Sequence, residues 1–176
     1  GYDDLEGVAN IIKYREVIEK KKTSYQLVLD QTPFYPEGGG QVGDTGYLEI
    51  EGQKISILNT KKENDLIIHF ISELPKVTNA PVKCVVNAKK RSLTANNHTA
   101  THLLQAALKE VLGSHIAQKG SLVNEKLLRF DFSHFSKVTD EEIRQIEQLV
   151  NQKIRQNISL NEKRNCPIDE AIEMGA

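Results

Sequence analysis

The stretch NNHTATHLL, residues 96–104, places His98 and His102 four residues apart, with Thr101 directly before the second histidine. On a helix, side chains four residues apart lie about one turn apart on one face, so both imidazoles can reach the same ion. Zinc accepts imidazole nitrogen, but a zinc site needs three or four ligands. The pair therefore indicates half of a metal site, and two solvated helix histidines remain the alternative. Thr99 stands where a metalloprotease HExxH motif has its glutamate, which excludes that motif.

The segment DQTPFYPEGGGQVGDTG, residues 30–46, is rich in glycine, proline and polar residues. Consecutive glycines allow positive φ and the close approach of a ligand, and Thr32 and Gln41 offer side-chain hydrogen bonds at either end. The glycines are Gly38, Gly39 and Gly40. A plain hairpin needs only a two-residue turn, so this length favours a binding loop over an elaborate hairpin. The lysine of a GxxxxGK phosphate loop is missing.

A third polar segment, SHIAQKGSLVNEKLLRFDFSHF, covers residues 114–135. We expect His115 and Gln118 to flank a turn at Gly120, in a loop that leads into a strand. Arg129 and Asp131 alternate with apolar residues and so point to one side of that strand. They form either a surface ion pair or part of a polar face turned toward the histidine helix.

The elements that must position these residues change character halfway along the chain. Short apolar or alternating runs separated by turn residues predict strands in the first half. They cover 24–30, 45–50, 54–59, 66–71 and 81–86. The pattern of 8–21 is ambiguous, and we assign it as a strand because a closed set of short strands needs a first member. Several short strands with turns between them are typical of a small barrel or sandwich. The sequence therefore predicts a β-barrel-like subdomain over residues 1–88.

The second half has a helical period. A helix is predicted over 92–112, with Gly113 at the position of a C-terminal cap. A strand over 127–132 follows, and then a helix over 139–154 that opens with a capping box. A strand over 159–164 and a helix over 167–174 complete the pattern. The prediction is an α+β fold, with residues 89–176 forming an α+β subdomain whose histidine helix packs on an antiparallel sheet.

Composition narrows the class of protein. Two cysteines in 176 residues form no disulfide framework, so a reducing, cytoplasmic location is expected. No apolar run is long enough to cross a membrane. A formal net charge of −1 supplies no global basic field for nucleic acid. The chain opens with Gly1 and has its one methionine at Met174, so we expect a piece of a longer protein.

Four motifs in this order, TPFYPEGGGQVGDTG, NHTATHLLQAAL, HIAQKGSLV and LRFDFSH, resemble the editing domain of alanyl-tRNA synthetases. The resemblance covers nearly the whole chain, and GYDDLE at the front resembles the segment that enters that domain. It implies hydrolysis of mischarged Ser-tRNA(Ala) and Gly-tRNA(Ala), in a parent enzyme that attaches alanine to tRNA(Ala) using ATP. A pocket for alanine cannot exclude smaller glycine and rejects an added hydroxyl poorly, so a second, hydrolytic site is needed.

The resemblance also implies a zinc site made from an HxxxH pair and a later CxxxH pair. His98 and His102 match the first pair. After Cys166 the fourth position is Glu170, so the second pair is absent, and in the family it lies beyond a segment resembling AIEMGA. We therefore expect zinc to be incomplete or absent in this chain, and the chain alone to have little or no deacylase activity.

Three further residues match family positions that line the editing pocket: Thr32, Thr101 and Gln118. The resemblance implies that the Thr32 hydroxyl contacts a serine substrate. We expect Thr32 to lie in a flexible loop, so removing its hydroxyl should cost the fold little stability. We expect the histidine helix, the glycine-rich loop and the Gln118 turn to meet in one groove that admits a tRNA acceptor end.

Two other functions stay open. A free-standing trans-editing deacylase shares the glycine-rich motif and the histidine pair, but the absent CxxxH pair argues against it. A non-catalytic tRNA-binding module needs local basic residues, because phosphate contacts come from Lys and Arg. Lys89, Lys90 and Arg91 could supply them, although a solvated charge run is the more ordinary interpretation.

Overall fold

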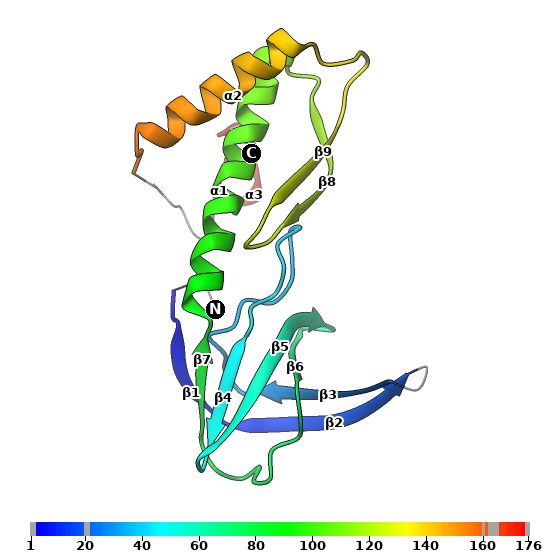
Figure 1. Ribbon diagram of the computed structural model, residues 1–176, viewed down its shortest axis with the longest axis vertical. Helices are drawn as coiled ribbons and strands as arrows, with labels where there is room; N and C mark the ends of the chain where they lie inside the picture. The colour runs from blue at the N-terminus through cyan, green and yellow to red at the C-terminus, as the bar shows by residue number, and fades with distance from the viewer. Residues whose placement is uncertain (1–2, 20–21, 160, 162–165, 175–176) are drawn as a thin grey trace.

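The computed structural model describes residues 3–19, 22–159, 161 and 166–174. Its fold is α+β, with a curled antiparallel sheet below and, above it, a long helix that packs against both a β-hairpin and a second helix (Figure 1). The sheet strands are β1 (Glu6–Ala9), β2 (Ile11–Glu19), β3 (Lys22–Leu29), β4 (Gly46–Ile50), β5 (Gln53–Glu63), β6 (Leu66–Ile71) and β7 (Val82–Val86). All the strands predicted in the first half are present, except that the single strand predicted over 8–21 is divided between β1 and β2.

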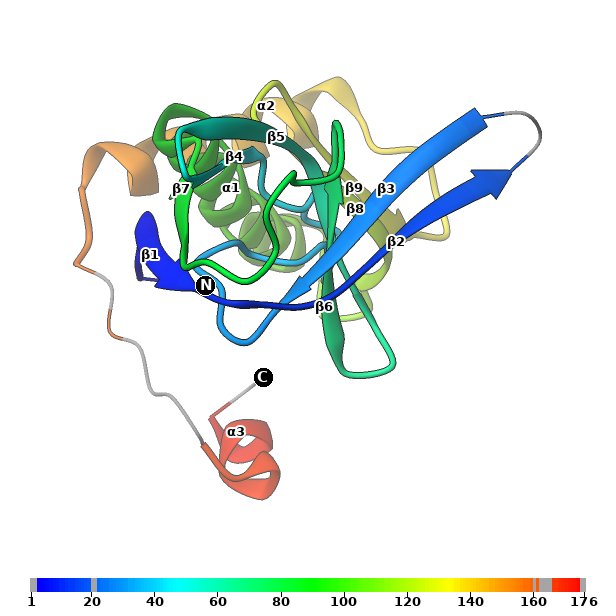
Figure 2. The same ribbon diagram turned by 90° about the horizontal axis from the view of Figure 1, so that it is seen from below.

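The seven strands are ordered β1-β7-β4-β5-β6-β3-β2, and every neighbouring pair is antiparallel. The sheet curls into a half-barrel, and Figure 2 shows the β2–β3 hairpin extending away from its body. The expected barrel is thus only partly formed, because β1 and β2 are the two ends of the strand order.

The core of the sheet comes from residues that alternate along its strands. In β5, Ile55 and Ile57 are buried while Lys54 and Ser56 are exposed, as the alternating sequence predicts. Phe34, from the glycine-rich loop, is fully buried with them. The cluster comprises Ala9, Leu27, Leu29, Phe34, Leu48, Ile50, Ile55, Ile57, Ile71, Val82, Cys84 and Val86.

The second half begins with α1 (Ala88–Leu112), four residues before the predicted start. Asn87 caps the helix by accepting a hydrogen bond from the Lys90 amide at 3.0 Å, so the charged residues after it form the first turn. The helix ends as predicted before Gly113, which has a φ of 114°.

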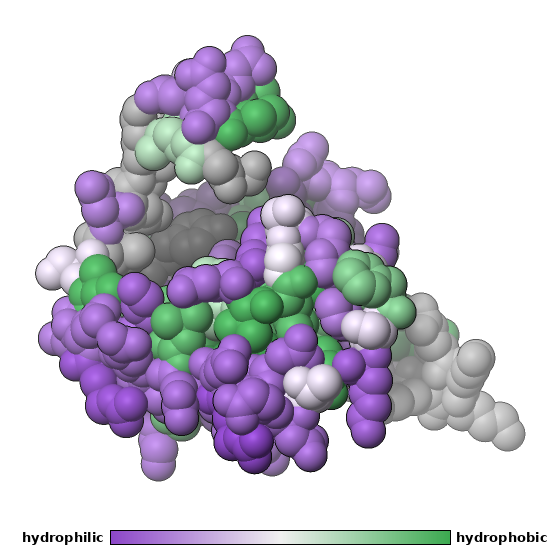
Figure 3. All heavy atoms as spheres, turned by 90° about the horizontal axis from the view of Figure 1, so that it is seen from above, coloured by the Kyte–Doolittle hydropathy of each residue, from purple (hydrophilic) through white to green (hydrophobic). Residues whose placement is uncertain are grey.

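The end of the molecule seen in Figure 3 is mostly hydrophilic, with hydrophobic side chains gathered in its middle.

The remaining elements are β8 (Ala117–Val123), β9 (Leu128–Ser133), α2 (Asp140–Arg155) and α3 (Ile168–Glu173). β8 corrects the prediction of a loop with a turn at Gly120, since this segment pairs antiparallel with β9 around a bulge at Gln118 and Gly120. The predicted capping box of α2 is confirmed at Thr139 and Glu142. The strand predicted over 159–164 falls mostly outside the described residues.

A second core lies between α1, α2 and the β8–β9 hairpin. Its buried members are Ala107, Leu108, Ile116 and Ile146. The predicted domain boundary between residues 88 and 89 stays a prediction. The two halves also contact each other, since the glycine-rich loop of the first half bonds to β8 of the second. None of the described helices is long and apolar enough to cross a membrane.

Gly43 lies where the glycine-rich loop passes over β5. A Cβ at this position would lie 2.0 Å from the carbonyl oxygen of Thr60, which is fixed in the sheet. We expect Gly43→Ala to lower the free energy of unfolding by about 2–3 kcal/mol, because backbone must move to admit the methyl group. Urea denaturation of the two proteins measures the difference.

Gly7→Ala is the matched control, because its Cβ would meet Pro33 at an ordinary 3.7 Å. We expect it to change the free energy of unfolding by less than about 0.5 kcal/mol. Equal losses in the two variants would show that the close contact at Gly43 is not the cause.

Candidate functional site

The three glycines form a tight turn. The Gln41 amide donates to the Gly38 carbonyl at 2.9 Å, and the Gly38 amide donates back to the Gln41 carbonyl at 3.1 Å. Gly39 and Gly40 between them have φ values of 57° and 82°. Positive φ at both central residues is the signature of a type I′ turn, which glycine adopts without strain. The motif is therefore a hairpin turn at the tip of a longer loop.

This turn docks on β8. The Val123 amide donates to the Gly40 carbonyl at 2.8 Å, and the Val42 amide donates to the Val123 carbonyl at 3.0 Å. A Cβ on Gly40 would lie 2.8 Å from the carbonyl oxygen of Ser121. The close approach that the glycines allow is made here by a strand of the same chain.

The docked turn brings Gln41 to the histidine pair. Gln41 is buried, and its Oε1 lies 2.5 Å from Nδ1 of His98. The rings of His98 and His102 stack with centroids 5.1 Å apart and planes 16° from parallel. Burial, and secondarily the proximity of His102, lower the pKa of His98 from its ordinary 6.5. Both effects favour a neutral imidazole, which is the form that binds metals.

The pair fits part of a zinc site. The two rings share one face of α1, and Nε2 of His98 is left for a ligand bond when Nδ1 is engaged by Gln41. Within the described parts of the chain, no three His, Cys, Asp or Glu side chains gather closely enough to hold a metal. Zinc binding stays a prediction.

Thr101 and Gln118 make bonds within this chain. Thr101 is buried and donates its hydroxyl to the Asn97 carbonyl at 2.8 Å, one turn earlier in α1. Gln118, exposed on β8, donates to the Ser121 hydroxyl at 3.3 Å, and Ser121 donates to the Gly39 carbonyl at 3.4 Å. Gln118 is thereby linked to the glycine turn through one side chain.

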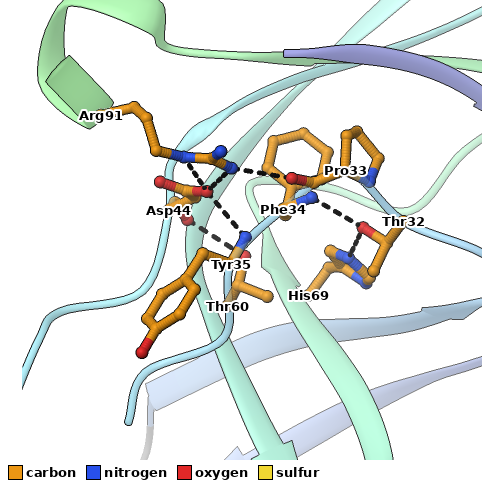
Figure 4. Close-up of polar contacts among 8 residues, drawn as sticks. All are labelled: Thr32, Pro33, Phe34, Tyr35, Asp44, Thr60, His69 and Arg91. Atoms are coloured by element: carbon orange, nitrogen blue, oxygen red, sulfur yellow. Dashed lines mark hydrogen bonds and ion pairs between the residues drawn. The ribbon is translucent and has the colours of Figure 1, made fainter. Parts of the chain in front are cut away.

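Thr32 lies at the other end of the loop, against the sheet. The Nδ1 of buried His69 lies 3.1 Å from the Leu27 carbonyl, which can only accept, so the ring proton is on Nδ1. Nε2 therefore accepts from the Thr32 hydroxyl, 2.9 Å away. The same hydroxyl accepts from the Phe34 amide at 3.1 Å (Figure 4). The expectation that Thr32 sits in a flexible loop does not agree with these bonds.

The loop between these two ends is held by Arg91 and Asp44 (Figure 4). Arg91 Nε donates to the Asp44 carboxylate at 2.8 Å, a second guanidinium nitrogen pairs with the same oxygen, and Arg91 also donates to the Pro33 carbonyl at 2.7 Å. The Tyr35 amide donates to this carboxylate at 2.7 Å. Only 13% of the Arg91 side chain and 8% of the Asp44 side chain are exposed.

These contacts correct the interpretation of the basic run before the histidines. The Arg91 side chain is mostly buried against Asp44, so it is neither solvated nor free to contact a phosphate. The sequence did not indicate this partner, which lies 47 residues away. Lys90 pairs with Glu125 at 4.0 Å. Arg129 and Asp131, by contrast, form the surface ion pair that was one of their two predicted roles.

The predicted single groove is only partly assembled. Gln41 contacts His98, which stacks on His102, and Gln118 is linked to the glycine turn through Ser121. Thr32 instead borders a hollow of about 140 Å³ beside β1, whose lining includes none of the histidines. A groove shared by Thr32 and the histidine pair stays a prediction.

Comparison with known proteins identifies the relatives of this chain. A family model described as class II (A) tRNA synthetases matches residues 1–90. Alanine–tRNA ligases of Cytophaga hutchinsonii and Bacteroides thetaiotaomicron are 65% and 60% identical over 176 residues. That of Flavobacterium psychrophilum is 50% identical over an alignment of 186 residues. These matches cover 100% of this chain and 20–21% of the relatives, so the chain spans about a fifth of their length.

The bonds of Thr32 predict a structural effect of its hydroxyl. We expect Thr32→Val to lower the free energy of unfolding by about 1–3 kcal/mol, because buried His69 Nε2 loses its donor and the Phe34 amide loses its acceptor. Thr32→Ser keeps the hydroxyl and should recover most of that loss. Denaturant titration of all three proteins measures it, and a Val variant as stable as the parent would contradict the bonding scheme.

His69 predicts an acid-side loss of stability. Burial lowers its pKa from 6.5 to about 4, so between these values the unfolded chain binds a proton that the folded chain does not. Stability therefore falls as pH decreases through this range. Protonation of His69 should lower the free energy of unfolding by roughly 2–3 kcal/mol between pH 7 and pH 4.5. Denaturation at several pH values measures the slope, which His69→Gln should flatten. A His69 resonance that titrates near 6.5 would refute this account.

Proposed function

The chain belongs to the class II (A) tRNA synthetase family, and from that premise we propose that it is the editing region of an alanine–tRNA ligase. In this proposal the whole ligase attaches alanine to tRNA(Ala) using ATP in the cytoplasm. The region formed by this chain hydrolyses the mischarged products Ser-tRNA(Ala) and Gly-tRNA(Ala). Such hydrolysis supplies the discrimination that an alanine pocket cannot achieve by binding alone.

One observation carries the proposal. Three motifs that are far apart in the sequence meet at the glycine turn. Gln41 of the turn contacts His98 on α1, and Gly39 of the turn accepts a hydrogen bond from Ser121 on β8. A site that must hold an ester between several groups requires this kind of convergence. The convergence also explains why the turn needs glycines, since Gly40 leaves no room for a Cβ beside β8.

The proposed roles of the residues follow from their bonding. His98 and His102 would hold zinc, which when bound supplies a Lewis acid to the ester. A water molecule is proposed to attack the ester carbonyl directly, without a covalent intermediate. The one Ser–His contact among the described polar contacts, Ser136 Oγ to His134 Nε2 at 3.1 Å, lies on the exposed segment after β9 and has no bond to the glycine turn.

The bonding of Thr32 restricts its proposed part in substrate recognition. Its proton is donated to His69 and one lone pair accepts from the Phe34 amide. The hydroxyl therefore has one acceptor position left. A contact with a serine substrate must have the serine hydroxyl as donor, an interaction that alanine and glycine cannot make.

The proposal is tested in a full-length alanine–tRNA ligase that contains this segment. We expect His102→Ala to reduce the rate of Ser-tRNA(Ala) deacylation by at least about 100-fold, because a metal ligand is lost. Aminoacylation with alanine should stay within about two-fold, since the synthetic reaction uses no residue of the histidine pair. Both rates are measured on the same preparation, with Gly-tRNA(Ala) as a second substrate.

His134→Ala is the matched control, because His134 contacts His115 and Ser136 rather than the glycine turn. It should leave deacylation unchanged. The 176-residue chain alone should hydrolyse little Ser-tRNA(Ala), since two imidazoles hold zinc weakly. Full deacylation by the His102→Ala enzyme would remove the histidine pair from the reaction and refute this form of the proposal.

A further inference from the structure

We propose that Gln41 is a positioning residue that keeps His98 in the tautomer with its proton on Nδ1 and its lone pair on Nε2. The bond between Gln41 and His98 is independent of any activity. Its use rests on the proposed function, in which the free lone pair serves a metal ion. Ligand histidines that donate their other ring N–H to a fixed oxygen are held in orientation and made more basic.

The position of Gln41 leaves its side chain little freedom. Its backbone closes the glycine turn in both directions with Gly38, and the next residue is bonded to Val123 of β8. The residue is 7% exposed, and its Oε1 lies 2.5 Å from Nδ1 of His98. His98 itself stands in the middle of a 25-residue helix, so both ends of the hydrogen bond are fixed by regular structure.

The chemistry of the contact sets the tautomer. An amide oxygen only accepts hydrogen bonds, so Nδ1 of His98 must carry the proton. A neutral imidazole has one N–H, and its second nitrogen then presents a lone pair. Nε2 is therefore the nitrogen that is available, on the face shared with His102.

His69 provides an internal reference in the same chain. Its Nδ1 donates to the Leu27 carbonyl at 3.1 Å, so it is held in the same tautomer as His98 by a group that has no contact with Gln41. A change confined to His98 on substitution of Gln41 therefore reports the loss of one hydrogen bond. A change at both histidines would report general unfolding.

The experiment is long-range ¹H–¹⁵N spectroscopy of the ¹⁵N-labelled 176-residue chain at pH 8, where the protonated and lone-pair nitrogens of each imidazole are distinguished. The five histidines are assigned by single substitutions. We expect the Nδ1–H form at His98 and His69 in the parent protein. Gln41→Leu should move His98 to the Nε2–H form or a mixture and leave His69 unchanged.

Gln41→Glu is the conservative rescue, because a carboxylate also accepts from Nδ1–H and should keep the parent tautomer. Dispersed backbone amide spectra verify that each variant is folded. An Nε2–H form of His98 in the parent would overturn the proposal, because Gln41 would then be presenting its amide donor. The proposal would also be overturned if His98 kept the Nδ1–H form in Gln41→Leu.

Titration of the metal-free full-length ligase and of its Gln41→Leu and Gln41→Glu variants with ZnCl₂ separates this inference from the proposed function. If the lone pair on Nε2 serves zinc, Gln41→Leu should weaken zinc binding by about 10-fold, and Gln41→Glu should not. Equal zinc affinity together with a changed tautomer would refute the metal role of His98 and leave the positioning role of Gln41 established.

Discussion

The buried ion pair between Arg91 and Asp44 joins the two halves of the molecule where α1 leaves the sheet. The carboxylate is shared by the guanidinium and the Tyr35 amide, and Arg91 also reaches the Pro33 carbonyl. Removing one partner of such a pair leaves an uncompensated buried charge, which typically costs 3–5 kcal/mol. The course of the glycine-rich loop, and with it the contact between Gln41 and His98, therefore depends on this anchor.

From the anchor the loop runs to two separate hydrophobic cores, one in the sheet and one under α1 and α2. Phe34 inserts into the first core, beside the bond between Thr32 and His69. The glycine turn reaches the hairpin that covers the second. Two backbone hydrogen bonds join the glycine-rich loop to Val123 of β8, and hydrogen bonds are directional. A polar bridge of this kind fixes the distance between the sheet and the histidine helix.

The same bridge gives the histidine pair its chemical character. Burial and the neighbouring His102 lower the pKa of His98, and the Gln41 oxygen that orients its ring comes from the first half of the chain. A helix alone would place the two rings on one face but would leave their tautomers to solvent. The glycine-rich motif is thus a structural part of the candidate site, because it bonds to β8 and places Gln41 against His98.

The sequence by itself determined what depends on neighbours in the chain. The alternation of β5, the capping box at Thr139 and the shared face of His98 and His102 all follow from local periods and local bonds. Only the tertiary structure decided the partners of Thr32, Arg91 and Gln41, which lie 37, 47 and 57 residues away. It also turned the segment at Gly120 into a strand, because that segment becomes regular only by pairing with β9. Spacing along a chain carries no information about which distant group will satisfy a buried donor or charge, and the candidate site is built from such groups.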